Sequence, residues 1–135
     1  MKDSSRTMRL AGVDIGTLTC RLLIADLSPG GRLQEIRSDR RILRLGEGVD
    51  QMKSLSQAAM DRVIHCLCEW KDVIDTYRVD GCTAVATSAV RDAGNRAEFL
   101  EKVKREAGFD VEVIIGDEDA SKLLSREYRG PWKLA

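Results

Sequence analysis

The sequence has no excess of charge of either sign, since 22 Lys and Arg residues balance 22 Asp and Glu residues. This balance gives no overall electrostatic basis for binding nucleic acid or an anionic membrane, so neither is expected as a partner. No apolar run approaches the length of a membrane span, and residues 1–9 lack the apolar core of a signal peptide. The sequence therefore predicts a cytoplasmic protein.

The cysteines and the single histidine lack the spacing of a metal site. Cys20, Cys66, Cys68 and Cys82 offer no pair with the gap that lets two thiolates meet one tetrahedral ion. We expect buried, reduced thiols. His65 has no acid or cysteine at ligand spacing, so it is interpreted as an incidental surface or half-buried residue.

Repeats, low-complexity segments and internal linkers are also absent. The chain has 135 residues, of which 43% are hydrophobic and 33% charged, as is typical of one globular domain. The expected division is a flexible N-terminus (1–9), a domain (10–128) and a tail (129–135).

The first part of the chain predicts three strands in an antiparallel meander, over residues 10–14, 20–27 and 33–45. A helix then follows over residues 56–77, where apolar residues recur at three- and four-residue steps. Ser54 or Ser56 is its candidate N-cap.

The second part alternates strands and helices. Strands are predicted at 82–87 and 111–115, with a helix between them that begins at a capping box at Asn95 and ends at Gly108. A last helix is predicted within 116–128. This β-β-β-α-β-α-β-α order predicts an α/β fold with a five-stranded mixed sheet and helices on both faces.

A polar turn between the first two strands is the strongest chemical signal. Gly16 lets the backbone approach a ligand closely, and the hydroxyls of Thr17 and Thr19 are hydrogen-bond donors, so the turn fits a phosphate. Asp14, at the end of a buried strand, is a candidate to hold a metal ion or position a water. The alternative is an ordinary hairpin turn whose side chains satisfy their own backbone.

Two more polar loops fall at the carboxyl ends of strands, where open sheets bind ligands. Thr87, Ser88 and Arg91 suit a phosphate, because a guanidinium donates two N–H groups to two oxygens. The alternative for Arg91 is a salt bridge with Asp92. The acids of the second loop, Asp117, Glu118 and Asp119, are candidates to activate water or carry Mg²⁺, or else they cap a helix.

Three motifs together resemble the N-terminal domain of the exopolyphosphatase and guanosine pentaphosphate phosphohydrolase (Ppx/GppA) family. They are Asp14-Ile-Gly-Thr17 with Arg21, the segment 86–95 (ATSAVRDAGN), and the segment 111–120 (VEVIIGDEDA). The loop 46–49 with Leu55 and Ser56 is also similar. A lone Asp-x-Gly-Thr is less specific, since sugar kinases, actin and heat-shock chaperones show it too.

The resemblance implies an actin-like, RNase H-like fold and removal of the terminal phosphate from polyphosphate or guanosine pentaphosphate with Mg²⁺. It assigns Asp14, Gly16, Thr17 and Thr19 to a phosphate loop and Arg91 to phosphate binding. The family's water-activating glutamate falls on Asp119, whose carboxylate is one methylene shorter, and Glu118 is the candidate substitute. Leu18 replaces a residue that is often polar in this loop.

The resemblance also implies a second domain that supplies the other wall of a cleft, and we expect no segment of residues 1–135 to correspond to it. We therefore expect that domain or a partner chain to complete the site, and a homodimer is one such arrangement. A non-catalytic relative that binds or senses polyphosphate or alarmone nucleotides remains an alternative, and a kinase-like domain is weaker because it leaves residues 87–95 unexplained. The preference between the two phosphate substrates and the oligomeric state stay open.

Overall fold

The computed structural model describes residues 6–114 and 133–134 of the chain. Its centre is a mixed β-sheet with the strand order β3-β2-β1-β4-β5, and β6 pairs with β4 off this path. The predicted antiparallel meander of β1 to β3 and the parallel addition of β4 and β5 are both confirmed. The strands are β1 (Met8–Ile15), β2 (Thr19–Leu27), β3 (Leu33–Ile42), β4 (Gly81–Ala86), β5 (Val111–Val113) and β6 (Lys133–Leu134).

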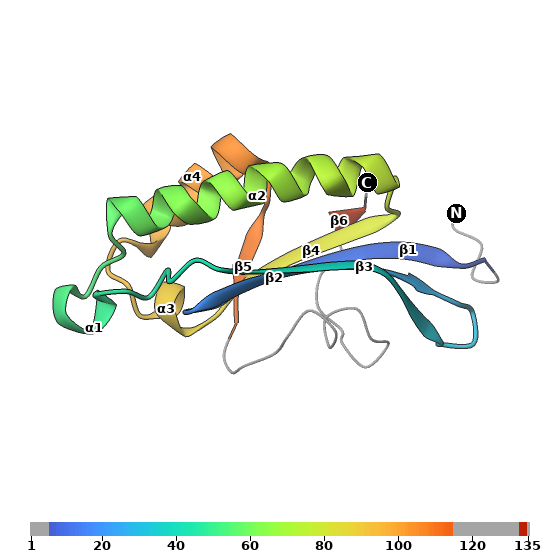
Figure 1. The fold of residues 1–135 in the computed structure, drawn as a ribbon, viewed down its shortest axis with the longest axis horizontal. Coiled ribbons are helices and arrows are strands. Elements are labelled where there is room, and N and C mark those ends of the chain that lie inside the picture. The colour runs from blue at the N-terminus through green and yellow to red at the C-terminus, as the bar shows by residue number, and fades with distance from the viewer. Residues whose placement is uncertain (1–5, 115–132, 135) are drawn as a thin grey trace.

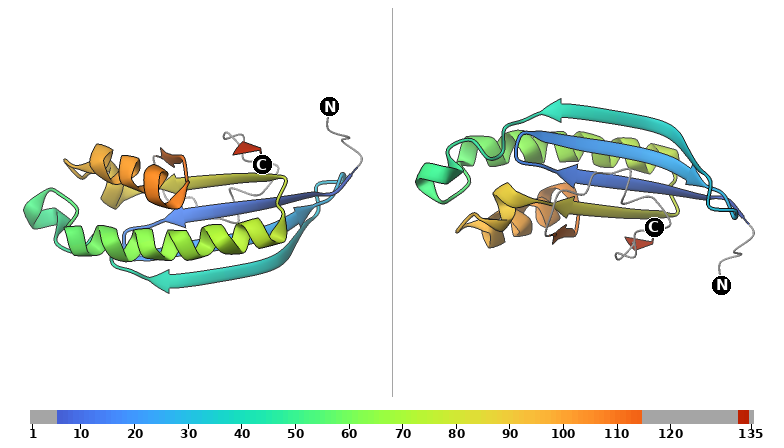
Figure 2. Two further views of the ribbon diagram at one scale, coloured as in Figure 1. Left: turned by 90° about the horizontal axis from the view of Figure 1, so that it is seen from above. Right: turned by 90° about the horizontal axis from the view of Figure 1, so that it is seen from below.

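The two long helices, α2 (Gln57–Tyr77) and α4 (Arg96–Ala107), lie side by side on one face of the sheet (Figures 1 and 2). Two short helices, α1 (Val49–Met52) and α3 (Ser88–Arg91), were not predicted, because four residues are too few to show a helical period. The helix predicted within residues 116–128 lies outside the described residues. The prediction of helices on both faces of the sheet therefore stays untested, because both long described helices cover the same face. None of the described helices has the length and apolarity needed to cross a bilayer.

The main core fills the space between the sheet and the two long helices. The predicted apolar stripe of α2 is buried except at Tyr77, which is half-buried. Ser56 is confirmed as the N-cap of α2, because its side chain accepts a hydrogen bond from the Ala59 N–H at 3.1 Å. Strand residues that point toward α2 alternate with residues on the other face, where Leu10, Leu23 and Ala25 form a second, smaller cluster. The largest fully buried side chains include Trp70, Phe99, Ile15, Leu22 and Ile24.

Several predicted boundaries are wrong by a few residues. The third strand ends at Ile42 rather than at residue 45, because the backbone turns at Arg44, whose φ is 55°. The segment 1–9 is not wholly outside the fold, since β1 begins at Met8, and the predicted tail contains β6. These differences arise from pairing with distant strands, which local sequence does not report.

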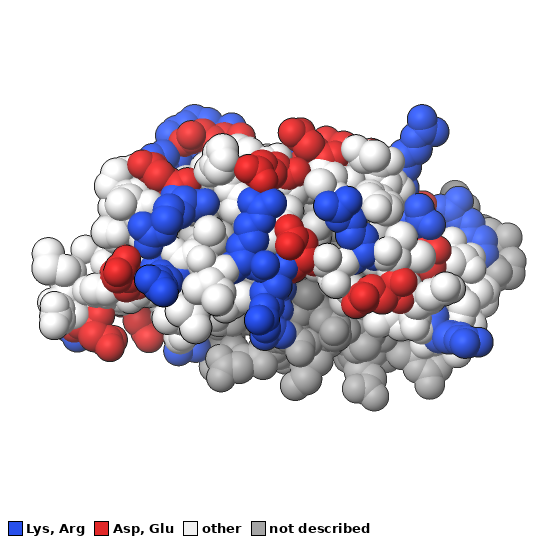
Figure 3. All heavy atoms as spheres, in the orientation of Figure 1, with Lys and Arg blue, Asp and Glu red and all other residues white. Residues whose placement is uncertain are grey.

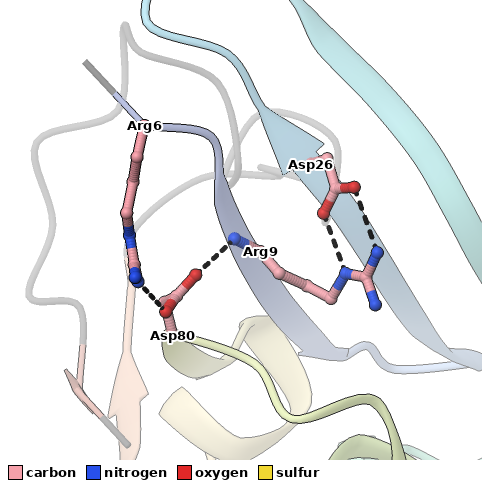
Figure 4. A network of polar contacts seen from close by, with 4 residues as sticks. All are labelled: Arg6, Arg9, Asp26 and Asp80. Carbon is pink, nitrogen blue, oxygen red and sulfur yellow. Dashed lines mark hydrogen bonds and ion pairs between the residues drawn. The ribbon is translucent and has the colours of Figure 1, made fainter. Parts of the chain in front are cut away.

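Polar contacts hold the start of β1, at the end of the sheet opposite the carboxyl ends of β1 and β4 (Figure 4). The Arg9 guanidinium donates two hydrogen bonds to Asp26, at 2.8 and 3.1 Å, and these raise the pKa of Arg9. Asp80 accepts the Arg9 N–H at 2.8 Å and forms an ion pair with Arg6. This network explains why the strand extends two residues further toward the N-terminus than the sequence predicts.

Candidate phosphate site

The turn between β1 and β2 is built around Gly16. Its N–H donates to the Thr19 carbonyl at 3.1 Å, which closes the turn. A Cβ added at Gly16 would lie 2.6 Å from that same carbonyl oxygen, so no larger residue fits without moving the backbone. The turn therefore requires glycine for close packing, and Thr17 and Leu18 are left exposed at its tip.

The loop after β4 meets this turn, as the parallel pairing of β1 with β4 predicts. The Thr87 N–H donates to the Ile15 carbonyl at 3.2 Å, which continues the β1–β4 contact beyond the strands. The hydroxyls of Thr17 and Ser88 lie 2.9 Å apart and share one hydrogen bond. Because each hydroxyl carries one proton, the one that accepts in this pair keeps its own proton to donate to a bound anion.

A third segment, the loop 43–48, closes around the same turn. The N–H groups of Leu43 and Arg44 both donate to the Leu18 carbonyl at 3.0 Å, and the Gly46 N–H donates to the Thr17 carbonyl at 2.9 Å. A Cβ at Gly46 would lie only 2.3 Å from Thr17 Cγ2. Gly46 is a site residue that the sequence motifs do not reveal, although the loop 46–49 belongs to the resemblance.

Arg62 of α2 fixes this loop to the helix layer. Its Nε donates to the Leu43 carbonyl at 3.0 Å, and its guanidinium lies 3.3 Å from a Glu47 carboxylate oxygen. A packed helix therefore supports the loop that contacts Thr17.

Asn95 has a different role from the predicted capping box, because its side chain forms no capping hydrogen bond to α4. Its Oδ1 accepts the Leu55 N–H at 2.8 Å, and its Nδ2 donates to the Leu55 carbonyl at 3.0 Å. The Gly94 N–H also donates to the Lys53 carbonyl at 2.8 Å. Asn95 thus joins the segment after α3 to the start of α2.

Arg91 lies at the end of α3, one-third exposed, with its Nε 3.3 Å from Asp92 Oδ1. The structure therefore contains the local ion pair that was the alternative interpretation of this residue. Asp92 is itself 63% exposed, and exposed ion pairs of this kind contribute little stability. A phosphate would compete with Asp92 for the guanidinium.

Asp14 lies half-buried near the end of β1, directly across from Arg21 of β2. Their strand positions place both side chains on the face opposite α2, because the neighbouring residues Val13, Ile15, Cys20 and Leu22 belong to the main core. Arg21 was part of the resemblance but not of the predicted phosphate set. The alternation of apolar and polar residues in the first two strands could have indicated it, because it places Arg21 on the same face of the sheet as Asp14.

The predicted acids Asp117, Glu118 and Asp119 lie outside the described residues. His65 is 80% exposed, as expected for a surface residue. The expectation that no acid lies near it is wrong, because Oε1 of Glu69, one helical turn later, lies 3.0 Å from its Nε2. Of the cysteines, Cys20 and Cys66 are buried, Cys68 and Cys82 are half-buried, and all four are free thiols.

The strand order, the turn between β1 and β2 and the loop after β4 define an actin-like, RNase H-like domain with a candidate phosphate site. Residues 23–124 match the model of the Ppx/GppA phosphatase family, and the chain belongs to this family.

Curated relatives are similar over most of this chain but are much longer. The chain is 34% identical to exopolyphosphatase 1 of Mycobacterium bovis over 116 residues, which cover 86% of this chain and 33% of that protein. It is 37% identical to a bifunctional 3-dehydroquinate synthase/phosphatase of Fusobacterium nucleatum, again over 116 residues, covering 82% of this chain and 18% of that protein. The chain thus spans a third or less of the length of these relatives.

Solved structures of the family share the fold. The Aquifex aeolicus family member superposes with a TM-score of 0.77 at 43% identity, over 81% of this chain and 35% of its own. An exopolyphosphatase from Cytophaga hutchinsonii gives a TM-score of 0.75 at 32% identity, over 80% of this chain and 34% of its own.

Proposed function

We propose that this chain is the N-terminal, phosphate-binding domain of a phosphoanhydride hydrolase that releases terminal phosphate from inorganic polyphosphate or guanosine pentaphosphate. The observation that carries the proposal is the meeting of the Thr17 and Ser88 hydroxyls, 2.9 Å apart, at the carboxyl ends of β1 and β4. The curated relatives of the chain include exopolyphosphatases. The chain spans a third or less of the length of these relatives, and we propose that a further domain or a partner chain completes the site.

The described residues fit the binding of a phosphoryl group. The turn at Gly16 brings the backbone and the Thr17 hydroxyl to the end of the sheet, Ser88 adds a hydroxyl, and Arg91 adds a guanidinium that can bind two oxygens at once. These groups stabilise the negative charge on a transferring phosphoryl group, which is most of what phosphoryl transfer requires of a protein. Of the other two predicted hydroxyls, Thr19 is half-buried at the end of the turn and Thr87 is buried at the start of the loop.

Magnesium is part of the proposal, and Asp14 is the residue that would hold it. Among residues 6–114, no three His, Cys, Asp or Glu side chains gather as a metal cluster. Mg²⁺ nevertheless fits this donor set, since it commonly binds one or two carboxylates together with substrate phosphate oxygens and water. Bound there, the ion would neutralise phosphate charge. Asp119, or Glu118 in its place, is proposed to activate the attacking water.

A non-catalytic binding or sensing domain is the second candidate. It is favoured by Asp119, which stands where the family resemblance places a glutamate, because the shorter side chain moves the carboxylate away from the water it would activate. The hydrolase and the sensing domain would both bind phosphate at this site, but only the hydrolase would release phosphate from its substrate.

Binding of long-chain polyphosphate to this chain, measured by calorimetry, tests the shared part of the proposal. Arg91→Ala should weaken binding by about 1.5–3 kcal/mol, the range for a hydrogen bond to a charged group. Arg105→Ala is the matched control, because Arg105 lies in the last turn of α4 and is 64% exposed. Equal losses in the two variants, or no binding by the parent chain, would contradict the assignment of this site.

A further inference from the structure

Two arginines face each other on the sheet surface that contains Asp14. The strand register pairs Asp14 of β1 with Arg21 of β2, and Arg21 with Arg40 of β3. Residues directly opposite one another on antiparallel strands share a face, so the three side chains form one row across three strands. The row lies on the face opposite α2.

The orientation of Arg40 follows from its neighbours in β3. Asp39 accepts a hydrogen bond from the Trp70 indole of α2 at 2.8 Å, and the Arg41 guanidinium lies 5.7 Å from the centre of the Trp70 ring. Both neighbours of Arg40 therefore point toward α2, and Arg40 points the opposite way. Figure 3 shows a vertical band of basic side chains near the middle of the face that carries α2 and β3. The basic residues of β3 itself are Arg37, Arg40 and Arg41.

Like charges placed directly opposite on neighbouring strands repel each other. Arg21 and Arg40 are both exposed, and no ion pair found within residues 6–114 involves either guanidinium. Arg41, by contrast, is paired with Glu69 at 2.8 Å. An anion lying across β2 and β3 would relieve the repulsion between Arg21 and Arg40.

We propose that Arg40 selects for long phosphate chains, by contacting a phosphate unit that extends across the sheet from the site at the Thr17 turn. This inference rests on the proposed function. Neighbouring strands lie about 4.8 Å apart, so the backbone of Arg40 is roughly 10 Å from that of Asp14. Orthophosphate bound at the turn is too small to reach it, whereas a polyphosphate chain can span both positions.

The test compares orthophosphate with long-chain polyphosphate as probes, using the full chain and its variants. Arg40→Gln should weaken polyphosphate binding about twofold to fivefold, as expected for one exposed charge contact, and leave orthophosphate binding unchanged. The slope of log K against log salt should fall by about one for polyphosphate, as it does when one phosphate contact of a polyanion is lost. Arg40→Lys should restore part of the affinity.

Arg37→Gln is the matched control, because Arg37 is exposed on the same strand but pairs with Ile24, whose side chain faces α2. It should leave the affinity for both probes unchanged. Equal losses in the two variants would show unspecific attraction and overturn the proposal, as would an Arg40→Gln variant with parental affinity for polyphosphate. If the parent chain binds neither probe, the proposed function itself is overturned. If the parent chain binds both probes and only the Arg40 variants behave differently from expectation, the proposed function stands and the role of Arg40 is overturned.

Discussion

The Asn95 side chain binds both backbone groups of Leu55, a residue 40 positions earlier, accepting its N–H at 2.8 Å and donating to its carbonyl at 3.0 Å. This pair of bonds holds the segment between α3 and α4 against the start of α2. The Asn95 amide thereby satisfies both backbone groups of Leu55, which no strand in the described part of the chain pairs.

Asn95→Ala should lower the free energy of unfolding by about 1–3 kcal/mol, because both backbone groups of the half-buried contact lose their partner. Urea denaturation of the parent and the variant measures this. Asn95→Asp is the control, since it keeps an acceptor for the Leu55 N–H but loses the donor, and it should lose less stability than alanine. An alanine variant as stable as the parent would show that water replaces the amide without cost.

Gly46→Ala should disturb the phosphate site by direct contact, because its Cβ would lie 2.3 Å from Thr17 Cγ2. The Thr17 side chain must then rotate or move, which breaks its hydrogen bond with Ser88. Calorimetry should show weaker orthophosphate binding. Thr17→Ser removes Cγ2 but keeps the hydroxyl, so the double variant Gly46→Ala with Thr17→Ser should recover part of the affinity. If the double variant binds orthophosphate no better than Gly46→Ala alone, the loss of affinity does not come from contact with Thr17 Cγ2.

Asp39 should make the protein more sensitive to acid. Burial acts to raise the pKa of this carboxyl, but hydrogen bonds from the Trp70 indole and the Arg40 N–H, together with nearby arginines, leave it below its ordinary value. Because the pKa is lower in the folded state, the stabilisation is fully present above the unfolded value of about 3.9 and is lost as the pH falls through the folded pKa.

Melting temperatures measured from about pH 6 to about pH 3 test this effect. The difference in stability between the parent and Asp39→Asn should shrink as the pH falls, because the amide cannot titrate and still accepts the Trp70 hydrogen bond. Parallel curves for the two proteins would mean that other carboxyls account for acid destabilisation.

The thiols should differ in reactivity in the native protein. Burial raises the pKa of Cys20 to about 12 and the pKa values of Cys66 and Cys82 to about 11. Cys68 is half-buried, and burial also raises its pKa. At about pH 8 we expect alkylation of Cys68 first and of Cys20 last, since only the thiolate reacts. Mass spectrometry of timed samples identifies the order, and early labelling of Cys20 would show that β2 opens readily.

Asp119 should limit hydrolysis in a protein that carries this domain together with the rest of the site. Asp119→Glu should raise the rate, and Asp119→Asn should lower the remaining rate by about 10²–10⁴-fold with substrate binding nearly intact, as for loss of a general base. Phosphate release from polyphosphate provides the measurement. If Glu118→Gln abolishes turnover and Asp119→Asn does not, the base is Glu118, and if neither matters, the sensing function is favoured.

The sequence placed the turn at Gly16 and the loop at Thr87 at the carboxyl ends of strands, where open sheets bind ligands. It did not predict that β1 and β4 are neighbours, which their parallel pairing in the structure shows. The contact between the Thr17 and Ser88 side chains agrees with that pairing. Their role in binding phosphate stays a prediction.

The supporting contacts were not predictable from local pattern. The approach of Gly46 to Thr17 depends on how a loop folds after β3, and Asn95 follows the local sequence pattern of a helix cap although its partner is 40 residues away. The pairing of Arg21 with Arg40 depends on the register of β2 with β3, which shifts between Ile24 and Ala25. Register is set by the whole sheet, and periodicity within one strand does not reveal it.

Strand β3 forms one end of the described strand order, and its composition discourages uncontrolled strand addition. A free β edge is a template for aggregation when it is flat and apolar. The charges at Glu35, Arg37, Asp39 and Arg40, together with the irregular register at Ile24 and Ala25, make this edge a poor match for a second strand. Arg40, which is proposed to contact a phosphate chain, would then also protect the domain from self-association at high concentration.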